Sequence, residues 1–172
     1  MTSLHDATIL TIGVISDTHG VLLSPIFDIF ASVDHILHAG DVQDMRILDE
    51  LEEIAPVNAV CGNVDFGPTQ RLPEKWSGTL AGVKIGMTHG HLLDPSKYNE
   101  SAARMFQDEK PDIIIHGHSH RAKHETYGKA SILNPGAACR PRFRDTPSVA
   151  LIFLKPGGKF HIEFREIPWR GN

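Results

Sequence analysis

"PDIIIHGHSHR", residues 111–121, is the segment that decides the fold class of this chain. Three consecutive isoleucines lead directly into histidines at positions 116, 118 and 120. A β-branched run this short is typical of a buried strand, because a helix needs a longer periodic segment. A strand end has no structural need for three imidazoles. The segment therefore indicates a strand whose end carries chemistry.

The same pattern, an apolar run followed at once by possible ligands, occurs five times in the chain. The runs are "ILTIGVIS", "HILHAG", "VNAVCG", "GVKIGMT" and "PDIIIHG". Stretches with helical spacing separate several of them, namely "LSPIFDIFASV", "DMRILDELEEIA" and "PSKYNESAARMFQDEK". This alternation predicts a largely parallel sheet with crossover helices, in which ligands gather beyond the carboxyl ends of the strands. We therefore expect the five polar strand ends to converge.

The rhythm changes after residue 130, where short strands follow one another without helices. The segments "ASILNPG", "PSVALIFLK" and "KFHIEFREI" predict an antiparallel arrangement, and "TLAGVKIG" (79–86) predicts a tight hairpin. With 172 residues and 41% hydrophobic content, the chain is expected to form a single domain over residues 1–172.

Composition limits the partners. With 17 basic and 21 acidic residues the formal net charge is -4, so no basic field favours stable nucleic-acid binding. Cys61 and Cys139 lack CxxC spacing, which favours a reducing compartment over a disulfide scaffold. No signal-peptide pattern or membrane-length apolar run is present. We expect a cytoplasmic protein without membrane association, and the sequence leaves its oligomeric state open.

The strand ends carry carboxylate, amide and imidazole donors and no thiolate. "DTH" (17–19) and "HSH" (118–120) each place two donors two residues apart, which project to the same side of extended backbone. These donors suit Mn, Fe, Zn or Co better than an all-oxygen calcium or magnesium site. Seven donors exceed the needs of one tetrahedral ion. The candidate metal ligands are Asp17, His19, Asp41, Asn63, His89, His118 and His120.

A bridging Asp41 would divide these donors between two ions. Asp17, His19 and His120 would then hold one ion, and Asn63, His89 and His118 the other. An isolated Asp-x-His is more often a turn or a cap, and "GHSH" alone could be a surface loop. Donors at five separate strand ends favour the metal site. For the remaining histidines we expect surface or packing roles, with orientation of a ligand as the alternative for three: His38, His91 and His116.

The ordered motifs resemble a known family. They are "DTHG" (17–20), "GDVQD" (40–44), "GNVD" (62–65), "THGH" (88–91) and "GHSHR" (117–121). Together they resemble the signature of calcineurin-like metallophosphoesterases, and the short length and "NPG" (134–136) resemble the small YfcE-type phosphodiesterases. The resemblance implies an α/β fold in which two mixed β-sheets pack as a sandwich flanked by helices. It also implies two divalent ions, Mn²⁺ above all, with Zn²⁺, Fe²⁺, Ni²⁺ or Co²⁺ as alternatives.

The resulting hypothesis is a hydrolase that cleaves phosphodiester bonds. A metal-bridging hydroxide would attack phosphorus in line, in a cationic well that one diester monoanion neutralises. The predicted catalytic residues are Asp41, Asn63 and His89. Two alternatives share the fold: a phosphomonoesterase with the same site, and a Vps29-like interaction scaffold, which resembles this chain in size. Proteins of the scaffold type have incomplete ligand sets, whereas the set here is complete.

Two further features bear on substrates. Many larger family members carry histidine directly after the asparagine, where it can protonate a leaving group; this chain has Val64. Activated diesters are therefore expected to be better substrates than alkyl monoesters. Arg140, Arg142 and Arg144 form a basic loop that is either a solvated surface or a phosphate clamp.

Overall fold

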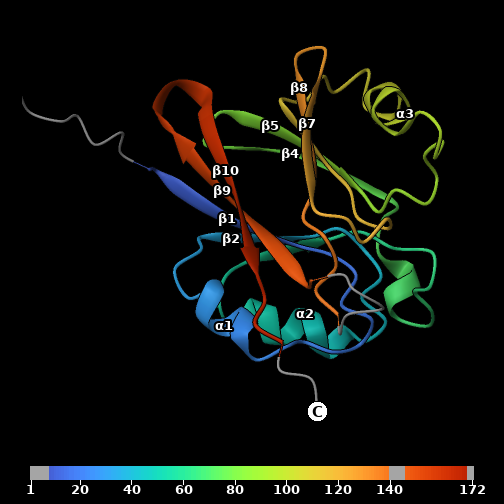
Figure 1. The fold of residues 1–172 in the computed structure, drawn as a ribbon, viewed down its shortest axis with the longest axis vertical. Helices are drawn as coiled ribbons and strands as arrows, with labels where there is room; N and C mark the ends of the chain where they lie inside the picture. Colours follow the sequence, from blue (N-terminus) through green and yellow to red (C-terminus); the bar gives the residue numbers. More distant parts are fainter. Residues whose placement is uncertain (1–7, 140–145, 170–172) are drawn as a thin grey trace, which may run out of the picture.

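Two five-stranded sheets face each other across the centre of the molecule (Figure 1). The computed structural model describes residues 8–139 and 146–169. The first sheet has the order β10-β9-β1-β2-β3 and contains β1 (Leu10–Ile15), β2 (His35–His38), β3 (Val57–Ala59), β9 (Ser148–Lys155) and β10 (Lys159–Glu166). The second has the order β4-β5-β6-β8-β7 and contains β4 (Lys75–Leu80), β5 (Val83–Thr88), β6 (Ile113–Ile115), β7 (Lys123–Tyr127) and β8 (Ala130–Asn134).

Helices cover the outer faces of the sheets. Figure 1 shows α1 and α2 along the first sheet and α3 beside the second. The helical elements are α1 (Pro25–Ile29), α2 (Met45–Glu52), α3 (Tyr98–Met105) and the short 3₁₀ turns η1 (Thr69–Arg71) and η2 (Pro156–Gly158). The predicted fold class, two mixed sheets packed as a sandwich flanked by helices, is confirmed. No helix in the described parts of the chain is long and apolar enough to cross a bilayer.

Three apolar layers hold these elements together. Ile12, Leu37 and Ile113 belong to the cluster between the two sheets. Phe30 belongs to the cluster that includes residues of α1 and α2, and Phe106 to the cluster around α3. The central strands are thus buried on both faces, which explains why their sequences are continuous apolar runs instead of alternating patterns.

Strand direction agrees with the sequence in the first part of the chain and differs at β8. β1, β2 and β3 are parallel, as are β5 and β6. β9 and β10 are antiparallel as predicted. However, β8 pairs parallel with β6 and antiparallel with β7, so the prediction of a wholly antiparallel second part is wrong. The polar edge strand β7 serves as the return connection, and its "KHETY" sequence carries no apolar signal that would identify a strand.

The β4–β5 hairpin is confirmed. Its turn residues Ala81 and Gly82 have φ values of 46° and 82°, the left-handed conformation required by a two-residue turn that matches strand twist.

Each helical layer approaches its sheet over a strand glycine. A Cβ added at Gly13 would lie 3.0 Å from the ring of Phe30, and one added at Gly86 would lie 2.7 Å from Phe106. Both phenylalanines are fully buried. The absence of a side chain at these two positions therefore sets how closely the outer layers pack.

We predict that Gly86→Ala lowers the free energy of unfolding by about 1–3 kcal/mol, because the added methyl group overpacks the layer around Phe106. Chemical denaturation measures this change. The double variant Gly86→Ala/Phe106→Leu should cost less than the sum of the two single changes. Additive effects would show that the glycine does not control this packing.

Candidate metal centre

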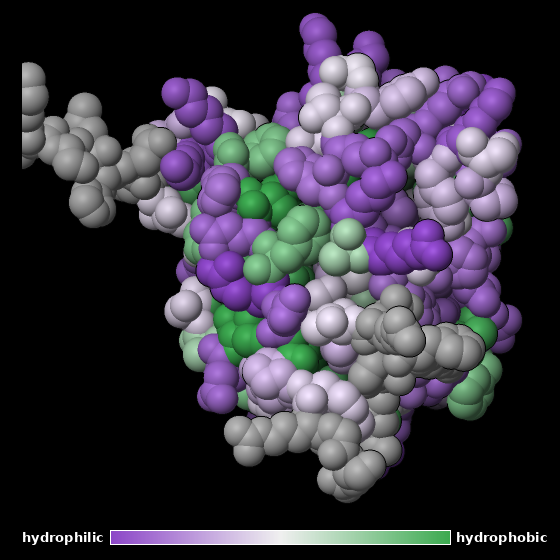
Figure 2. Space-filling model, viewed as in Figure 1, coloured by the Kyte–Doolittle hydropathy of each residue, from purple (hydrophilic) through white to green (hydrophobic). Residues whose placement is uncertain are grey.

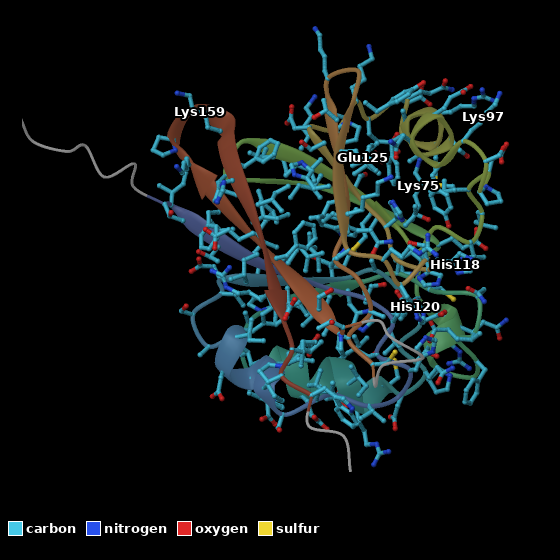
Figure 3. The ribbon with its side chains drawn as sticks, in the orientation of Figure 1. Lys75, Lys97, His118, His120, Glu125 and Lys159 are labelled. Atoms are coloured by element: carbon cyan, nitrogen blue, oxygen red, sulfur yellow. The ribbon has the colours of Figure 1, made fainter. Side chains whose placement is uncertain are left out.

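Ligand-type side chains from both sheets meet around the carboxylate of Asp17, which follows β1. Its Oδ1 atom lies 3.2 Å from His120 Nε2, 3.8 Å from His89 Nε2 and 4.0 Å from His19 Nε2. His89 follows β5 and His120 lies beyond β6, so the second sheet supplies two of these three imidazoles. Figure 3 shows His118 and His120 where loops from the two sheets meet. The predicted convergence of strand ends is present for these residues.

A second carboxylate, that of Asp41 after β2, completes the buried group. Its Oδ2 lies 3.2 Å from His89 Nε2 and 3.9 Å from His19 Nε2. The ring of His118 is 5.2 Å from that of His89, centroid to centroid. Asp17, Asp41 and His89 each offer an atom within 4.8 Å of the others, so this buried trio could hold a metal ion.

Two buried polar atoms in this group, Asp17 Oδ1 and His89 Nε2, have no hydrogen-bond partner. His89 Nδ1 is 2.7 Å from the carbonyl oxygen of Ala39, which accepts its proton and leaves a lone pair on Nε2. That lone pair faces two carboxylate oxygens, an arrangement that is unfavourable unless a cation lies between them. The donor set therefore fits divalent ions.

Hydrogen bonds fix which oxygen of Asp17 faces the imidazoles. Asp17 Oδ2 accepts from Ser16 Oγ at 2.7 Å and from the backbone N–H of His118 at 3.1 Å. Oδ1 is left to point toward the histidines. The His118 contact also ties the end of one sheet to the end of the other.

The backbone at the donors is left-handed, not extended. The φ values are 56° at Asp17, 49° at His19, 56° at Asp41, 66° at His118 and 60° at His120. The prediction that each i, i+2 pair projects from extended backbone is therefore wrong. Non-glycine residues seldom adopt this conformation, and such strain concentrates at functional sites. Tight turns, not straight strand ends, aim these side chains.

Two glycines allow these turns to approach one another. A Cβ at Gly62 would lie 2.0 Å from Asp41 Oδ1, and one at Gly117 would lie 1.9 Å from Ser16 Oγ. A side chain at the glycine of "GNVD" or of "GHSH" would therefore overlap a neighbouring loop, so glycine is required there whatever the preference of the turn.

Asp65 organises the loops around Asp41. Its buried carboxylate accepts three backbone N–H groups: that of Asp41 at 3.1 Å, that of Gln43 at 2.6 Å and that of Gly62 at 2.7 Å. Sequence reasoning treated "GNVD" as a turn with one ligand and missed this role. The available signal was an aspartate two residues after a proposed ligand, in a loop that must be held rigidly.

His38 and Asn134 also support the donors through hydrogen bonds. His38 is fully buried, and burial lowers its pKa to about 4, so it is neutral. It accepts from the Gly40 N–H at 3.2 Å, and its other nitrogen is 3.0 Å from Thr18 Oγ1. Asn134 Nδ2 donates to Gly117 O at 2.8 Å and to Ser119 Oγ at 3.0 Å, which fixes the "GHSH" turn.

His116, the first of the three alternating histidines, is buried and does not belong to either donor group. Its ring packs 5.0 Å from that of Tyr98, and its Nδ1 lies 3.3 Å from Asn134 Nδ2. Packing, the role expected for it, is what the structure gives.

Asn63 lies beside Asp41 but is not part of the buried group. Its neighbour Val64 donates a backbone N–H to Asp41 Oδ1 at 3.1 Å. The Asn63 residue itself is exposed and lines a hollow of about 370 Å³ together with His91 and Asp65. Its assignment as a ligand stays a prediction. The arginines at 140, 142 and 144 lie outside the described residues.

The structure adds a donor that the sequence analysis did not include. Cys139, in the segment after β8, places its sulfur within 4.8 Å of ligand nitrogens of His19 and His120. The structure thus places a thiol beside two of the predicted nitrogen donors, a neighbour that the sequence pattern did not indicate.

We predict that divalent-metal affinity weakens on acidification from a pH above 6.5. Burial lowers the pKa of His89, but the carboxylates of Asp41, 3.2 Å from its Nε2, and of Asp17 more than offset this, so its pKa is raised from 6.5. A metal needs deprotonated Nε2, so affinity should fall about tenfold per pH unit once pH is below the raised pKa. In the metal-free protein the same shift stabilises the fold at low pH, and this contribution is lost as pH rises through the folded-state pKa.

Calorimetric titration with Mn²⁺ between about pH 8 and pH 6, in buffers of different ionisation enthalpy, measures both the affinity and the proton released. A constant affinity over this range, with no proton release, would contradict the competition at His89.

We predict that Asp65→Ala destabilises the protein by about 2–4 kcal/mol, because buried N–H groups lose a charged acceptor, and that metal affinity falls with it. The matched control is Asp94→Ala, which removes an exposed carboxylate whose oxygen accepts from Ser96. Denaturation and metal titration of both variants make the comparison. Equal effects would mean that Asp65 is an ordinary turn residue.

The chain is similar in sequence to proteins of a known family. Residues 10–156 match the calcineurin-like phosphoesterase superfamily domain. A probable metallophosphoesterase of Methanocaldococcus jannaschii is 37% identical over 138 residues, which cover 77% of this chain and 70% of that protein. A phosphodiesterase of the same organism is 28% identical over 150 residues, covering 76% and 85%.

Solved structures agree on the fold. A Vps29 variant from Entamoeba histolytica superposes with a TM-score of 0.76 at 24% identity, covering 92% of this chain and all of that one. A predicted phosphoesterase from Streptococcus pneumoniae has a TM-score of 0.70 at 30% identity, covering 91% and 98%. The chain therefore belongs to the calcineurin-like phosphoesterase superfamily.

Proposed function

We propose that this protein is a metal-dependent phosphodiesterase that acts on a small phosphodiester with two divalent ions. The observation that carries the proposal is the buried pair of partnerless atoms, Asp17 Oδ1 and His89 Nε2, surrounded by further donors. The phosphodiesterase relative from Methanocaldococcus jannaschii supports the choice of diester over monoester. Manganese is the first ion to test, because the donors are mixed nitrogen and oxygen.

When bound, the ions would lower the pKa of a water molecule and stabilise negative charge on the phosphoryl group. The residues of the chain would hold the ions and keep their own positions fixed. Asp17, His19 and His120 would hold one ion, and Asp41 and His89 would approach both positions. His118 and Asn63 are exposed, so they lie on the side from which a substrate can enter. Backbone N–H groups that donate to Asp65, and hydrogen bonds donated by Ser16 and Asn134, hold these groups in place before substrate arrives, which lowers the reorganisation that catalysis requires.

A polar cleft of about 680 Å³ lies next to this entrance. Ser119, Asn134 and Tyr98 line it, as do the cationic side chains of Arg121 and Lys123 and the carboxylates of Glu100 and Glu125. Figure 2 shows this side of the molecule, over α3 and β7, as mainly hydrophilic. A cleft with cationic side chains beside a phosphate-binding centre would suit the second, anionic or polar ester group of a diester.

A scaffold function, as for the Vps29 neighbours in fold, is the second candidate. At 24% identity that likeness shows the fold alone. A scaffold has no need of buried, partnerless donors aimed at one another or of five strained donor residues, since both features lower stability. These features favour the enzyme.

We predict that Asp41→Asn lowers kcat/KM for bis(p-nitrophenyl) phosphate by at least about 100-fold and reduces metal occupancy, because one anionic donor facing two imidazoles is neutralised. The matched control is His35→Asn, whose Nε2 bonds Asn58 Oδ1 at 2.9 Å in a different part of the first sheet. Elemental analysis and the Mn²⁺-dependent assay give the two readouts. Two tightly held ions in Asp41→Asn would contradict a bridging role for this carboxylate. Wild-type protein that binds no metal and shows no activity would contradict the enzyme and favour the scaffold function.

We predict that wild-type protein prefers activated diesters over alkyl monoesters, because Val64 cannot protonate a poor leaving group. The Val64 side chain is 38% exposed, so a larger ring has room there. Val64→His should raise activity on alkyl monoesters toward the ~100-fold that a positioned general acid typically contributes. The ratio of kcat/KM for the two substrate types in both proteins is the measurement. A wild-type preference for alkyl monoesters would reject the assignment.

A further inference from the structure

Cys139 lies against two proposed metal ligands that come from different sheets. Its sulfur, a His19 nitrogen and a His120 nitrogen all lie within 4.8 Å of one another. His19 Nε2 and His120 Nε2 are 3.3 Å apart. We propose that Cys139 is a thiolate ligand of the ion held by His19 and His120, and that this position therefore selects a thiophilic ion such as Zn²⁺ over Mn²⁺. The proposal rests on the metal centre proposed above.

The local geometry suits one ion with four donors. With Zn–N bonds of about 2.0–2.1 Å and a Zn–S bond of about 2.3 Å, ligand atoms around a tetrahedral zinc ion are roughly 3.3–3.8 Å apart. The 3.3 Å between the two imidazole nitrogens falls at this spacing. The 3.2 Å between His120 Nε2 and Asp17 Oδ1 is just below it, and the 4.0 Å between His19 Nε2 and Asp17 Oδ1 is just above it. The Cys139 sulfur lies within 4.8 Å of both imidazole nitrogens, so it would have to move closer to bind the same ion. The four donors are then Asp17, His19, His120 and Cys139.

The ordinary alternative is that Cys139 is a small buried side chain that fills space. Cys61 illustrates that role in this protein. Its Sγ contacts the Gly62 carbonyl oxygen at 3.3 Å, and burial raises the pKa of its thiol, so it stays protonated. No pair of imidazole nitrogens lies within ligand distance of Cys61 among the described residues. Cys139 differs because two imidazole nitrogens, one from each sheet's loop, lie within 4.8 Å of its sulfur.

The consequence is an unequal metal pair. The position at Cys139 offers sulfur and two nitrogens, the preference of zinc, iron(II) or cobalt(II), whereas Asp41, His89 and Asn63 offer nitrogen and oxygen, which manganese accepts. A coordinated thiol is deprotonated, so three anionic ligands face two divalent ions and leave a net charge of about +1, or about zero once a bridging hydroxide is counted. A thiolate ligand therefore lowers the attraction for a monoester dianion more than that for a diester monoanion.

The decisive experiment loads metal-free wild-type protein with Co²⁺ and records its absorption spectrum. A cobalt–thiolate bond produces an intense charge-transfer band in the near ultraviolet, apart from the weak visible bands that any bound Co²⁺ gives. We expect this band in wild type and in Cys61→Ser, and its loss in Cys139→Ser with the visible bands retained. Visible bands without the charge-transfer band in wild type would overturn the assignment and leave the metal centre intact.

Failure of Co²⁺ to bind at all would instead reject the metal centre, so the two proposals fail differently. A band that survives in Cys139→Ser but disappears in Cys61→Ser would also overturn the assignment. The wild-type spectrum decides the matter even if Cys139→Ser does not fold.

Competition between Zn²⁺ and Mn²⁺ provides the second measurement. Wild-type protein dialysed against both ions should retain one tightly bound zinc, and the preference for zinc should fall by about tenfold or more in Cys139→Ser. An unchanged zinc preference in a folded Cys139→Ser protein would show that the sulfur does not bind the ion.

Discussion

The carboxylate of Asp17 is the constraint on which the arrangement of the two sheets depends. One oxygen accepts hydrogen bonds from Ser16 in the first sheet's loop and from the His118 backbone in the second sheet's loop. The other faces three imidazoles at 3.2–4.0 Å, two of them from the second sheet. A buried carboxylate without compensating charge is costly, so these contacts, and the cations that the donors fit, favour one relative placement of the sheets. Fold and site are thus mutually dependent at this residue.

The loops around Asp17 position the donor side chains through backbone conformations that lower local stability. Five donor residues have left-handed backbone, and strain of this kind persists only where the surroundings over-determine it. Asp65, Asn134 and neutral His38 supply the surrounding hydrogen bonds. The apolar layers on both sides of each sheet supply the remaining stability.

The donor chemistry differs between the two ends of the centre. Asp41 and His89, which are buried, offer an oxygen and a nitrogen. His19 and His120 are partly exposed and lie near the sulfur of Cys139. This difference comes from Cys139, which lies outside the sequence motifs that carry the other donors. It also connects metal selection with substrate charge, since each anionic ligand reduces the attraction for phosphate.

The sequence by itself determined the strand–ligand pattern and the residues that gather around Asp17, because apolar runs and donor residues are local signals. The sandwich of two sheets followed from the resemblance of the ordered motifs to a family, since the strand–helix alternation alone predicted a largely parallel sheet. It did not reveal the direction of β8, since β7 is a polar edge strand without periodicity. Only the tertiary structure showed that Asp65 caps three N–H groups, that the donors sit on left-handed turns, and that Cys139 adjoins His19 and His120. Two of these features depend on loops that meet in space, at separations from 24 residues between Asp41 and Asp65 to 120 residues between His19 and Cys139. Such meetings leave no trace in local spacing, because they are fixed by how the two sheets pack.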